Sequence, residues 1–342
     1  MSPKNLSASK KTRKLLLNNL KNKKTFQIYN KFERNLKLNE DFIVAVSGGS
    51  DSLALSFLAK IYSIKKSIKV KYIVVDHKLR KNSTSETIFV RNLLKKISAK
   101  LKILKWIGKK PSSNIQSLAR KKRYNLLVDE AKKSKIKNIL LGHHQGDLYE
   151  NFFIRILRGT GLNGLISLSE KTYYKNINLI RPLLKFSKKD LIYISKKIFG
   201  TYVQDPSNED DKFKRVRIRK LIYNLESEGL DLAKFNLTIK NLKFANKSIN
   251  FFIEKNINEN TYYLKKNNSF ILNRNFFNYP EEVVFRSLVE VIRIVGKKYY
   301  PVRGKKIDNL LELINARRSF KLTLGNCIIK KVKETIIIAK EH

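Results

Sequence analysis

The sequence has 342 residues, of which 73 are lysine or arginine and 28 are aspartate or glutamate, and its formal net charge is +45. Hydrophobic residues make up 42% of the chain, which is enough for packed cores and excludes a wholly disordered protein. The single cysteine, Cys327, excludes an internal disulfide, a zinc site built from several cysteines and a cysteine-bound iron–sulfur cluster.

The N-terminal segment is strongly basic. Residues 1–24 contain no acidic residue and are rich in Lys, Asn, Ser and Leu, which predicts a loose basic arm. From Phe26, apolar residues at Tyr29, Phe32 and Leu36 follow the spacing of one face of a short helix. We expect this helix to pack against the domain that follows.

The next part of the chain, residues 25–211, alternates short apolar runs with longer amphipathic segments. The runs cover residues 42–46, 70–75, 101–106 and 138–142. This rhythm predicts an α/β domain with a parallel sheet wrapped by helices. In such sheets ligands bind beyond the carboxyl ends of the strands, so we expect the functional residues directly after these runs.

The rest of the chain changes pattern, and the total length predicts two or three domains. Residues 212–256 have helical spacing and many lysines, which predicts a helical linker region. Residues 257–342 predict a smaller α+β C-terminal domain. The elements expected there are, in chain order, a hairpin over 262–272 turning at Asn267-Asn268, helices over 276–296 and 303–317, and a final hairpin over 319–339 turning at Gly325-Asn326 and near Lys333.

The basic charge favours a polyanionic partner. A positive field of this size attracts phosphate backbones, with an affinity that falls steeply with salt. Codon bias toward lysine explains part of the excess, and binding to a membrane surface is a rival interpretation. We find no run of eighteen apolar residues and no apolar signal-peptide core. We therefore expect a soluble, cytoplasmic protein that contacts nucleic acid.

One loop lies directly between the first predicted strand and the helix that begins near Leu53. Its glycines let backbone N–H groups approach an anion, its hydroxyls add donors, and the helix N-terminus adds its dipole. An ordinary helix cap is the alternative, but a cap needs one such residue and this loop has six. We therefore expect phosphate binding by Ser47, Gly48, Gly49, Ser50, Asp51 and Ser52.

This loop does not end in lysine, so it is not the Walker loop of ordinary kinases and GTPases. Its Ser-Gly-Gly-x-Asp-Ser pattern resembles the signature of the pyrophosphate-loop (PP-loop) ATPases. That resemblance implies ATP cleavage between the α and β phosphates, which adenylates a carbonyl or carboxylate. It also implies that Asp51 holds Mg²⁺ against the pyrophosphate, since a carboxylate is a hard ligand for a hard cation.

Further motifs follow the loop in a characteristic order. They are Val75-Asp-His-Lys-Leu-Arg80, Asn114-Ile-Gln-Ser-Leu-Ala-Arg-Lys-Lys-Arg-Tyr124, Gly142-His-His-Gln-Gly-Asp-Leu-Tyr-Glu-Asn151, Arg158-Gly-Thr-Gly161, Arg181-Pro-Leu-Leu184 and Asp205-Pro-Ser-Asn208. Their order and spacing resemble the tRNA(Ile)-lysidine synthase family over about residues 40–225. Beyond residue 225 the resemblance is looser, although Thr323-Leu-Gly-Asn-Cys327 is similar to the family's C-terminal region.

The histidine motif contains several ionisable residues. The spacing of His143, Asp147 and Glu150 predicts one helix face that points into the same crevice as Asp51. Ionisable groups that converge on a phosphate site seldom have a purely structural role. The alternative is that His143 and His144 are buried at the start of a helix and form hydrogen bonds with backbone groups. The family usually has two consecutive aspartates and a glutamine here. This chain has Gly146-Asp147-Leu148 instead, which leaves one carboxylate fewer.

The resemblance implies a two-step reaction on the wobble cytidine of a tRNA(Ile) with the anticodon CAU. The C2 oxygen first attacks the α-phosphate of ATP, and the amine of free L-lysine then attacks C2 and expels AMP. Asp51, Asp147, Glu150, His143 and Arg120 are the expected catalytic residues, with Asp51 and Asp147 on the metal and Asp147 and Glu150 on lysine. We expect Arg215, Arg217 and Arg219 to contact the tRNA.

Three alternatives stay open at this point, and the sequence also leaves a homodimer open. A tRNA thiolase of the same superfamily would share the loop and the charge, but sulfur carriers generally need paired cysteines or a cluster. A ligase acting on small metabolites would leave the charge unexplained. A basic RNA-binding protein with an inactive nucleotide site is the non-enzymatic alternative.

Overall fold

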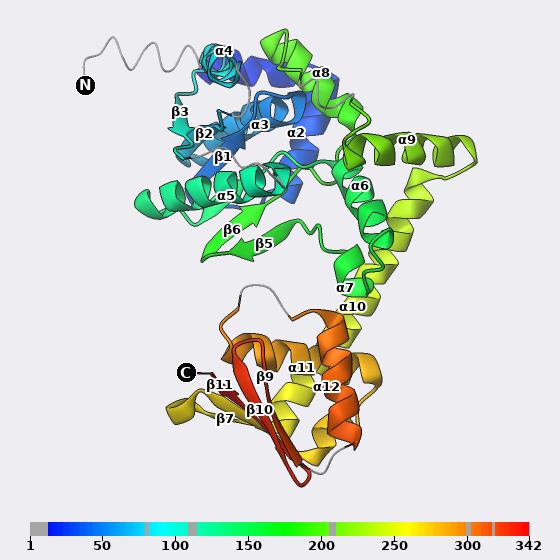
Figure 1. Ribbon diagram of the computed structural model, residues 1–342. Helices are drawn as coiled ribbons and strands as arrows, with labels where there is room; N and C mark the ends of the chain where they lie inside the picture. The colour runs from blue at the N-terminus through cyan, green and yellow to red at the C-terminus, as the bar shows by residue number, and fades with distance from the viewer. Residues whose placement is uncertain are drawn as a thin grey trace. The chain divides into compact units, whose positions relative to one another are not determined.

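The computed structural model describes residues 13–78, 82–108, 115–204, 210–298, 302–316 and 319–341. The chain divides into two compact units, Met1–Leu230 and Asp231–His342 (Figure 1). Each unit has its own sheet and its own hydrophobic core.

The first unit is built on a six-stranded sheet. Its strands are β1 (Phe42–Val46), β2 (Val70–Asp76), β3 (Leu101–Lys105), β4 (Asn138–Leu140), β5 (Lys171–Tyr174) and β6 (Ile177–Ile180). The order is β3-β2-β1-β4-β6-β5, and every pair is parallel except the β5–β6 hairpin. The four expected strands and the α/β class are thus confirmed. The β5–β6 hairpin was not predicted, because each strand has only four residues and its pattern is too short to recognise.

Helices cover both faces of this sheet (Figure 1). The α-helices assigned in this unit include α2 (Lys23–Asn35), α3 (Ser50–Lys66), α4 (Ser83–Lys95), α5 (Ile115–Lys133), α6 (Gln145–Ile156), α7 (Leu162–Leu165), α8 (Lys188–Phe199) and α9 (Lys214–Ser227). One core joins α2, α3, α4 and α8 to one face of the sheet. A second core packs α5 against the other face through Leu127, Val128 and Ala131. Such two-sided burial explains why the central strand β1 is continuously apolar.

The strand order places the phosphate loop at a switch point of the sheet. From β1 the chain moves outward through β2 and β3, and it then returns to the other side of β1 at β4. Ligands in open α/β sheets bind where the strand order reverses in this way. The segment that follows β4 touches the end of the phosphate loop, since a Cβ placed on Gly142 would lie 3.3 Å from the backbone carbonyl carbon of Asp51.

The N-terminal segment differs from the loose arm that we expected over residues 1–24. Residues 13–18 are helical and continue into a short 3₁₀ helix, η1 (Asn19–Lys21). Leu16 is buried in the main core, and Leu17 and Leu20 pack against it. Clustered leucines therefore anchor this basic segment, while residues 1–12 lie outside the described residues. The helix expected from Phe26 onward is confirmed as α2, which buries Ile28, Tyr29 and Phe32.

In its described residues, the second unit combines an antiparallel sheet with three α-helices. The strands β7 (Thr261–Leu264), β8 (Ser269–Leu272), β9 (Ser319–Leu324), β10 (Cys327–Val332) and β11 (Thr335–Lys340) pair in the order β7-β8-β11-β10-β9. The helices are α10 (Leu232–Asn260), α11 (Glu281–Val295) and α12 (Gly304–Ala316), with short 3₁₀ turns η3 (Lys265–Asn267) and η4 (Arg274–Phe277). The expected hairpins and helices of this region are confirmed, and Cys327 is fully buried in its core.

The segment that we expected to form one helical linker, residues 212–256, is shared between the units. Helix α9 packs on α6 in the first unit, whereas α10 packs on α11 in the second. The boundary lies at Leu230 and Asp231, where Asp231 caps α10 by accepting hydrogen bonds from Ala233 N and Lys234 N. Among the described residues, no helix is both long and apolar enough to cross a membrane.

Candidate active site

The phosphate loop is folded around the hydroxyl of Ser52. Its Oγ accepts hydrogen bonds from the N–H groups of Ser47 and Gly48, each at 3.1 Å, and donates to Gly49 O at 3.0 Å. Gly48 has φ +90°, and a Cβ there would approach Val90 Cγ2 to 2.5 Å, so position 48 requires glycine. Ser52 therefore holds the loop in shape.

The first turn of α3 leaves its backbone donors available. Its N-cap is Gly49, which provides no side-chain hydrogen bond to the helix. The N–H groups of a first helical turn have no partner inside the helix, and the dipole favours an anion beside them. The described structure thus favours an anion cradle over the ordinary capping role that was the alternative for this loop.

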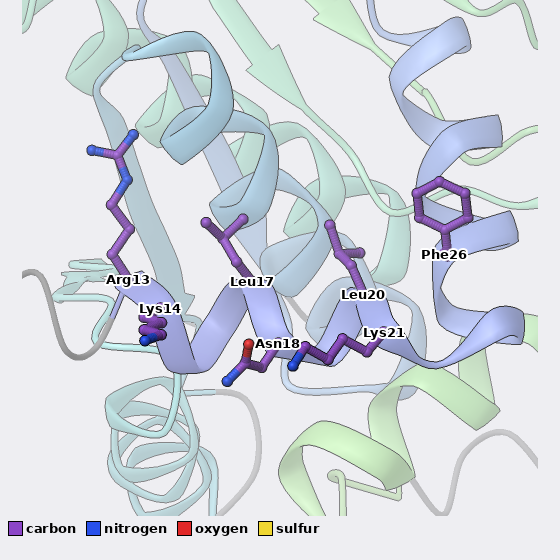
Figure 2. Close-up of a pocket in the computed structure, with 7 residues that line it drawn as sticks. All are labelled: Arg13, Lys14, Leu17, Asn18, Leu20, Lys21 and Phe26. Carbon is purple, nitrogen blue, oxygen red and sulfur yellow. The ribbon is translucent and has the colours of Figure 1, made fainter.

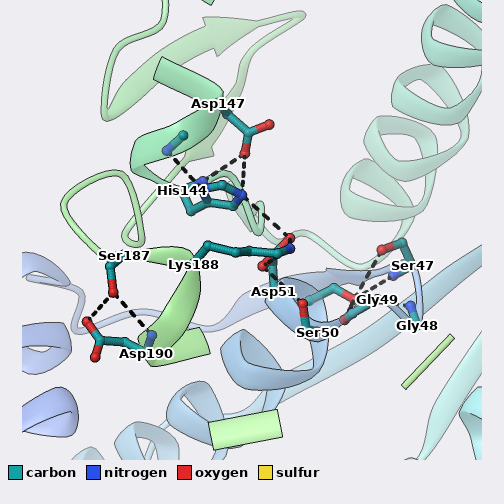
Figure 3. Close-up of polar contacts among 12 residues, drawn as sticks. Ser47, Gly48, Gly49, Ser50, Asp51, His144, Asp147, Ser187, Lys188 and Asp190 are labelled. Carbon is teal, nitrogen blue, oxygen red and sulfur yellow. Dashed lines mark hydrogen bonds and ion pairs between the residues drawn. The ribbon is translucent and has the colours of Figure 1, made fainter. Parts of the chain in front are cut away.

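Asp51 lies in this first turn and faces two cationic or proton-bearing side chains (Figure 3). Lys188 Nζ is 2.7 Å from both carboxylate oxygens of Asp51. His144 Nε2 lies 3.9 Å from Asp51 Oδ2 and 3.8 Å from Asp147 Oδ2. The two carboxylates that we expected to hold metal are therefore close together, on either side of one imidazole nitrogen.

His144 is the N-cap of α6 and forms a capping box with Asp147. The ring Nδ1 of His144 accepts a hydrogen bond from Gly146 N at 2.9 Å, and the backbone N–H of His144 donates to Asp147 Oδ2 at 2.9 Å. Since Nδ1 is an acceptor, we infer that neutral His144 carries its proton on Nε2. A proton donor then faces Asp51 and Asp147.

His143 precedes α6 and does not share the helix face predicted for it, because the helix begins only at Gln145. Its Nε2 lies 3.5 Å from Arg120 Nη2, and its buried Nδ1 has no hydrogen-bond partner among the described residues. Burial lowers the pKa of His143 to about 3 against the opposing effect of Asp147, and Arg120 lowers it further. His143 is therefore neutral near pH 7.

Arg120 comes from α5 and reaches the same place. It donates a hydrogen bond to Tyr124 Oη at 3.0 Å and lies over that ring at 5.1 Å from its centroid. The structure therefore brings Arg120 to the expected group of ionisable residues, beside His143.

Glu150 is buried on α6 and is paired with arginines of α9. Arg219 Nε lies 2.6 Å from its Oε1, while Arg215 Nε lies 3.9 Å from its Oε2. Among the described residues, Glu150 Oε2 has no hydrogen-bond partner. Arg215 also lies 4.0 Å from Asp147 Oδ1. Burial by itself would raise the pKa of Asp147, but the histidine rings, the His144 N–H and Arg215 keep that pKa below its usual value.

Several other motif residues support the fold. Asp76 is buried at the end of β2 and accepts hydrogen bonds from Ser83 and Thr84 at the start of α4. Arg181 donates to Ser169 O at 3.0 Å and to Thr172 Oγ1 at 3.1 Å, which links it to β5. The Asp205-Pro-Ser-Asn208 motif lies outside the described residues, as do Leu79, Arg80 and Asn114.

A hollow of about 470 Å³ lies elsewhere, against the N-terminal helix (Figure 2). Apolar side chains of Leu17, Leu20 and Phe26 line it together with basic and polar residues of the same segment. None of the expected site residues lines it. The phosphate loop and its carboxylates are therefore the better candidate for a catalytic site, because they bring anion donors and ionisable groups together.

The sequence did not single out Lys188. His144 was considered only as a buried histidine that satisfies backbone groups at the start of a helix, and its hydrogen bond from Gly146 N confirms that interpretation. Lys188 opens α8, which is capped by Ser187 through hydrogen bonds with Asp190. The signal was the Ser-x-x-Asp pattern shortly after Arg181-Pro-Leu-Leu184, which is typical of a helix N-terminus. It would have placed Lys188 at the start of a helix, but not beside Asp51.

Comparison with known proteins identifies the family of this chain. A family model described as a PP-loop domain matches residues 18–226. The tRNA(Ile)-lysidine synthase of Orientia tsutsugamushi (strain Boryong) is 32% identical over 91% of this chain and 71% of its own length. That of Wolbachia pipientis wMel is 31% identical over 89% of this chain and 71% of its own length.

The chain belongs to the tRNA(Ile)-lysidine synthase family. It is therefore an ATP-utilising enzyme of the PP-loop type, as the loop and the later motifs indicated. The U34-tRNA thiolase NcsA from Methanococcus maripaludis with its [4Fe-4S] cluster has a similar structure, with a TM-score of 0.55 at 15% identity over 64% of this chain and 77% of that chain. That likeness shows a shared fold.

Proposed function

We propose that this protein ligates free L-lysine to C2 of the wobble cytidine, C34, of a tRNA(Ile) with the anticodon CAU. The observation that carries the proposal is the phosphate loop at the uncapped start of α3, where Asp51 and the half-buried Asp147 approach one imidazole nitrogen of His144, in a chain of the lysidine synthase family. This arrangement joins a place for ATP to a place for an amine. Such a reaction on tRNA belongs in the cytoplasm.

In the first step, the C2 oxygen of cytosine attacks the α-phosphate of ATP, and the bond to pyrophosphate breaks. The N–H groups of the first turn of α3 and the proton on His144 Nε2 face the region in which negative charge increases. Asp51 and Asp147 are suited to hold Mg²⁺, because this ion commonly uses one or two carboxylates together with phosphate oxygens. Mg²⁺ held there would neutralise phosphate charge.

The metal assignment depends on substrate as well as protein. Among the described residues, no group of three or more His, Cys, Asp or Glu side chains could hold a metal ion by itself. Two carboxylates near one imidazole nitrogen still fit Mg²⁺ when the remaining ligands are phosphate oxygens and water. ATP and Mg²⁺ are then expected to bind together.

In the second step, the ε-amine of lysine attacks C2, and the bond to AMP breaks. Glu150 Oε2 is a buried acceptor without a hydrogen bond, and Arg215 stands loosely between it and Asp147. We propose that the lysine ammonium enters here, because a buried carboxylate oxygen without a donor is costly unless it is paired. Arg215 would have to give way.

The amine must lose a proton before it attacks. His143, with a pKa of about 3, is poorly matched to the role of proton acceptor that we expected for it, since an efficient base has a pKa near the working pH. We propose instead that His143 positions Arg120, because its neutral Nε2 can accept from the guanidinium. Glu150, the buried carboxylate of the lysine site, is proposed to receive the proton.

The tRNA contacts belong to both units. Arg217 donates to Asp211 O at 2.8 Å and Lys212 O at 3.2 Å, and Arg215 and Arg219 face Glu150. We propose that these half-exposed arginines reach the RNA beside the reacting nucleotide. Helix α10 supplies a second surface, defined here as the α10 face and composed of Leu237, Lys240, Phe244, Lys247, Phe251 and Lys255.

The α10 face combines exposed apolar side chains with lysines. Leu237, Phe244 and Phe251 are 54%, 52% and 63% exposed, and they recur every seven residues along one side of the helix. The ammonium groups of Lys240 and Lys247 lie 5.5 and 6.0 Å from the Phe244 ring centroid. Aromatic rings that stack on bases, next to cations that pair with phosphates, are typical of RNA-binding surfaces.

The experiment that tests the function measures incorporation of lysine. The protein is incubated with ATP, Mg²⁺, labelled lysine and unmodified tRNA(Ile) bearing CAU, and the label in RNA is counted. We expect label in this tRNA and none when C34 is replaced by U. AMP release that depends on tRNA but leaves the RNA unlabelled would contradict the lysine step. The absence of any AMP release would support a non-enzymatic RNA-binding protein.

The thiolase alternative is disfavoured by the cysteine content. The sequence contains one cysteine, whereas cysteine ligands of an iron–sulfur cluster usually number three or four. Cys327 is also buried in the second unit, where its Sγ lies 3.4 Å from Ile292 O. Burial raises the pKa of this thiol to about 11, so little reactive thiolate is present at neutral pH.

A further inference from the structure

The phosphate loop carries no cation of its own, and a lysine from another element approaches it. None of the six residues from Ser47 to Ser52 is basic. Lys188, 137 positions later in the chain, places its Nζ at 2.7 Å from both carboxylate oxygens of Asp51 (Figure 3). Helix α8 packs against α3, so this approach follows from the packing of the domain.

We propose that Lys188 is a phosphate-binding residue that exchanges partners. In the nucleotide-free protein Lys188 neutralises Asp51, and it moves to the pyrophosphate part of ATP when the nucleotide enters. The inference rests on the proposed function only for the use of ATP. It needs no RNA and no lysine.

The exposure of the two side chains makes the exchange inexpensive. The Lys188 side chain is 47% exposed and that of Asp51 is 23% exposed. An ion pair in contact with water contributes little net free energy, so Lys188 can leave Asp51 at small cost. A pyrophosphate group carries more negative charge than one carboxylate, and its hydrogen bonds to lysine are charge-assisted.

The same geometry explains how one carboxylate can serve two cations. Both oxygens of Asp51 are occupied by Lys188, so a divalent cation competes with the ammonium for this side chain. Once Lys188 has moved to the phosphate, Asp51 becomes available to the metal.

The test measures pyrophosphate binding by calorimetry in the presence of EDTA, which isolates the protein's own donors. We expect K188M to weaken binding about tenfold, the effect of losing one charge-assisted hydrogen bond. K188R should stay within about threefold, because it keeps the charge. The matched control is K189M, since Lys189 is exposed, lies on the same helix and carries the same charge. Equal affinities for K188M and K189M would overturn the proposal.

A second measurement separates phosphate binding from a structural role. Mn²⁺ titrated alone, followed by electron paramagnetic resonance, should bind K188M as tightly as wild type or more tightly, because its competitor at Asp51 is gone. Loss of both Mn²⁺ and pyrophosphate binding would show that Lys188 only maintains the site, which also overturns the proposal. If K188M does not fold, K188Q replaces it as the uncharged variant. A denaturation midpoint equal to that of the wild type shows that the variant is folded. Neither ligand requires tRNA, so a failure of lysine incorporation leaves this result intact.

Discussion

Gly146 lies beneath the imidazole ring of His144, and a Cβ at position 146 would meet ring atom Cε1 at 2.6 Å and Nδ1 at 3.1 Å. The family usually has an aspartate at this position. Here the smaller residue leaves room for the His144 ring, whose Nε2 then faces Asp51 and Asp147. The glycine at position 146 and the position of the His144 ring therefore depend on each other.

This coupling can be measured with a double-mutant cycle of G146A and H144A. In the wild-type background we expect G146A to lower the free energy of unfolding by about 1–3 kcal/mol, because the methyl group overpacks against the ring. In the H144A background the same change should be neutral or stabilising by about 0.5–1 kcal/mol, since alanine favours the helix. Urea unfolding measures both values. Equal effects in the two backgrounds would contradict the coupling.

His143 predicts a pH dependence of stability. Its folded-state pKa is lowered to about 3, whereas an unfolded histidine has a value of about 6.5. Between these values the unfolded chain binds the extra proton, so the free energy of unfolding falls as the pH is lowered.

We expect H143Q to lose less stability than wild type on acidification through this window. The difference in slope is at most about 1.4 kcal/mol per pH unit, which corresponds to one proton. Urea unfolding at pH values from about 7 to about 4.5 measures it. Parallel stability curves for the two proteins would show that His143 is not kept neutral by the fold.

At the scale of elements, the contact of α9 with α6 supplies the ion-pair partners of Glu150. The Glu150 side chain is 4% exposed and that of Arg219 is 44% exposed, at a distance of 2.6 Å. A buried carboxylate deprived of its partner is destabilising, whereas the half-exposed guanidinium is partly stabilised by water. The packing of α9 on α6 therefore depends on the negative charge of Glu150. In the described structure, Arg219 of α9 neutralises that charge at 2.6 Å.

Removal of this arginine is expected to destabilise the first unit. R219M should lower the free energy of unfolding by about 1–3 kcal/mol, less than for a fully buried pair. R217M is the matched control, because Arg217 lies on the same helix and bonds only exposed backbone carbonyls; its loss should cost below about 1 kcal/mol. The double variant E150M/R219M should recover most of the loss in chemical denaturation. Equal effects of R219M and R217M would contradict this account.

At the scale of the whole molecule, the net charge of +45 predicts salt-dependent binding of RNA. Codon bias explains an even scatter of lysines, but it does not explain the regular alternation of lysine and phenylalanine on the α10 face. The α10 face belongs to the second unit, so we expect part of the salt-dependent RNA binding to come from that unit.

We expect replacement of Lys240, Lys247 and Lys255 by glutamine to weaken tRNA binding and to flatten its salt dependence. The slope of log K against log salt should fall by about 2 to 3, because each phosphate contact contributes about 0.7 to 0.9. Filter binding at several salt concentrations measures the slope. The matched control replaces Lys265, Lys266 and Lys297, which are exposed lysines of the same unit. Equal slopes for the two triple variants would contradict an RNA-binding role of the α10 face.

The sequence by itself determined the strand rhythm, the parallel sheet, the phosphate loop and the family resemblance. These features are local, since a strand is a continuous apolar run and the loop is six consecutive residues between a strand and a helix. The antiparallel C-terminal hairpins were equally predictable from their turn residues, Asn267-Asn268 and Gly325-Asn326. The unexpected β5–β6 hairpin shows the limit, because strands of four residues leave too short a pattern to recognise.

Only the tertiary structure decided which charges meet. Lys188 and Asp51 are 137 positions apart, and Arg219 and Glu150 are 69 positions apart. No local pattern specifies such pairs, because they result from the packing of α8 on α3 and of α9 on α6. The same packing divided residues 212–256 between two units and placed Asp51 and Asp147 on either side of His144. Charge and motif can be counted along a chain, but their partners depend on distances that exist only after the elements have packed.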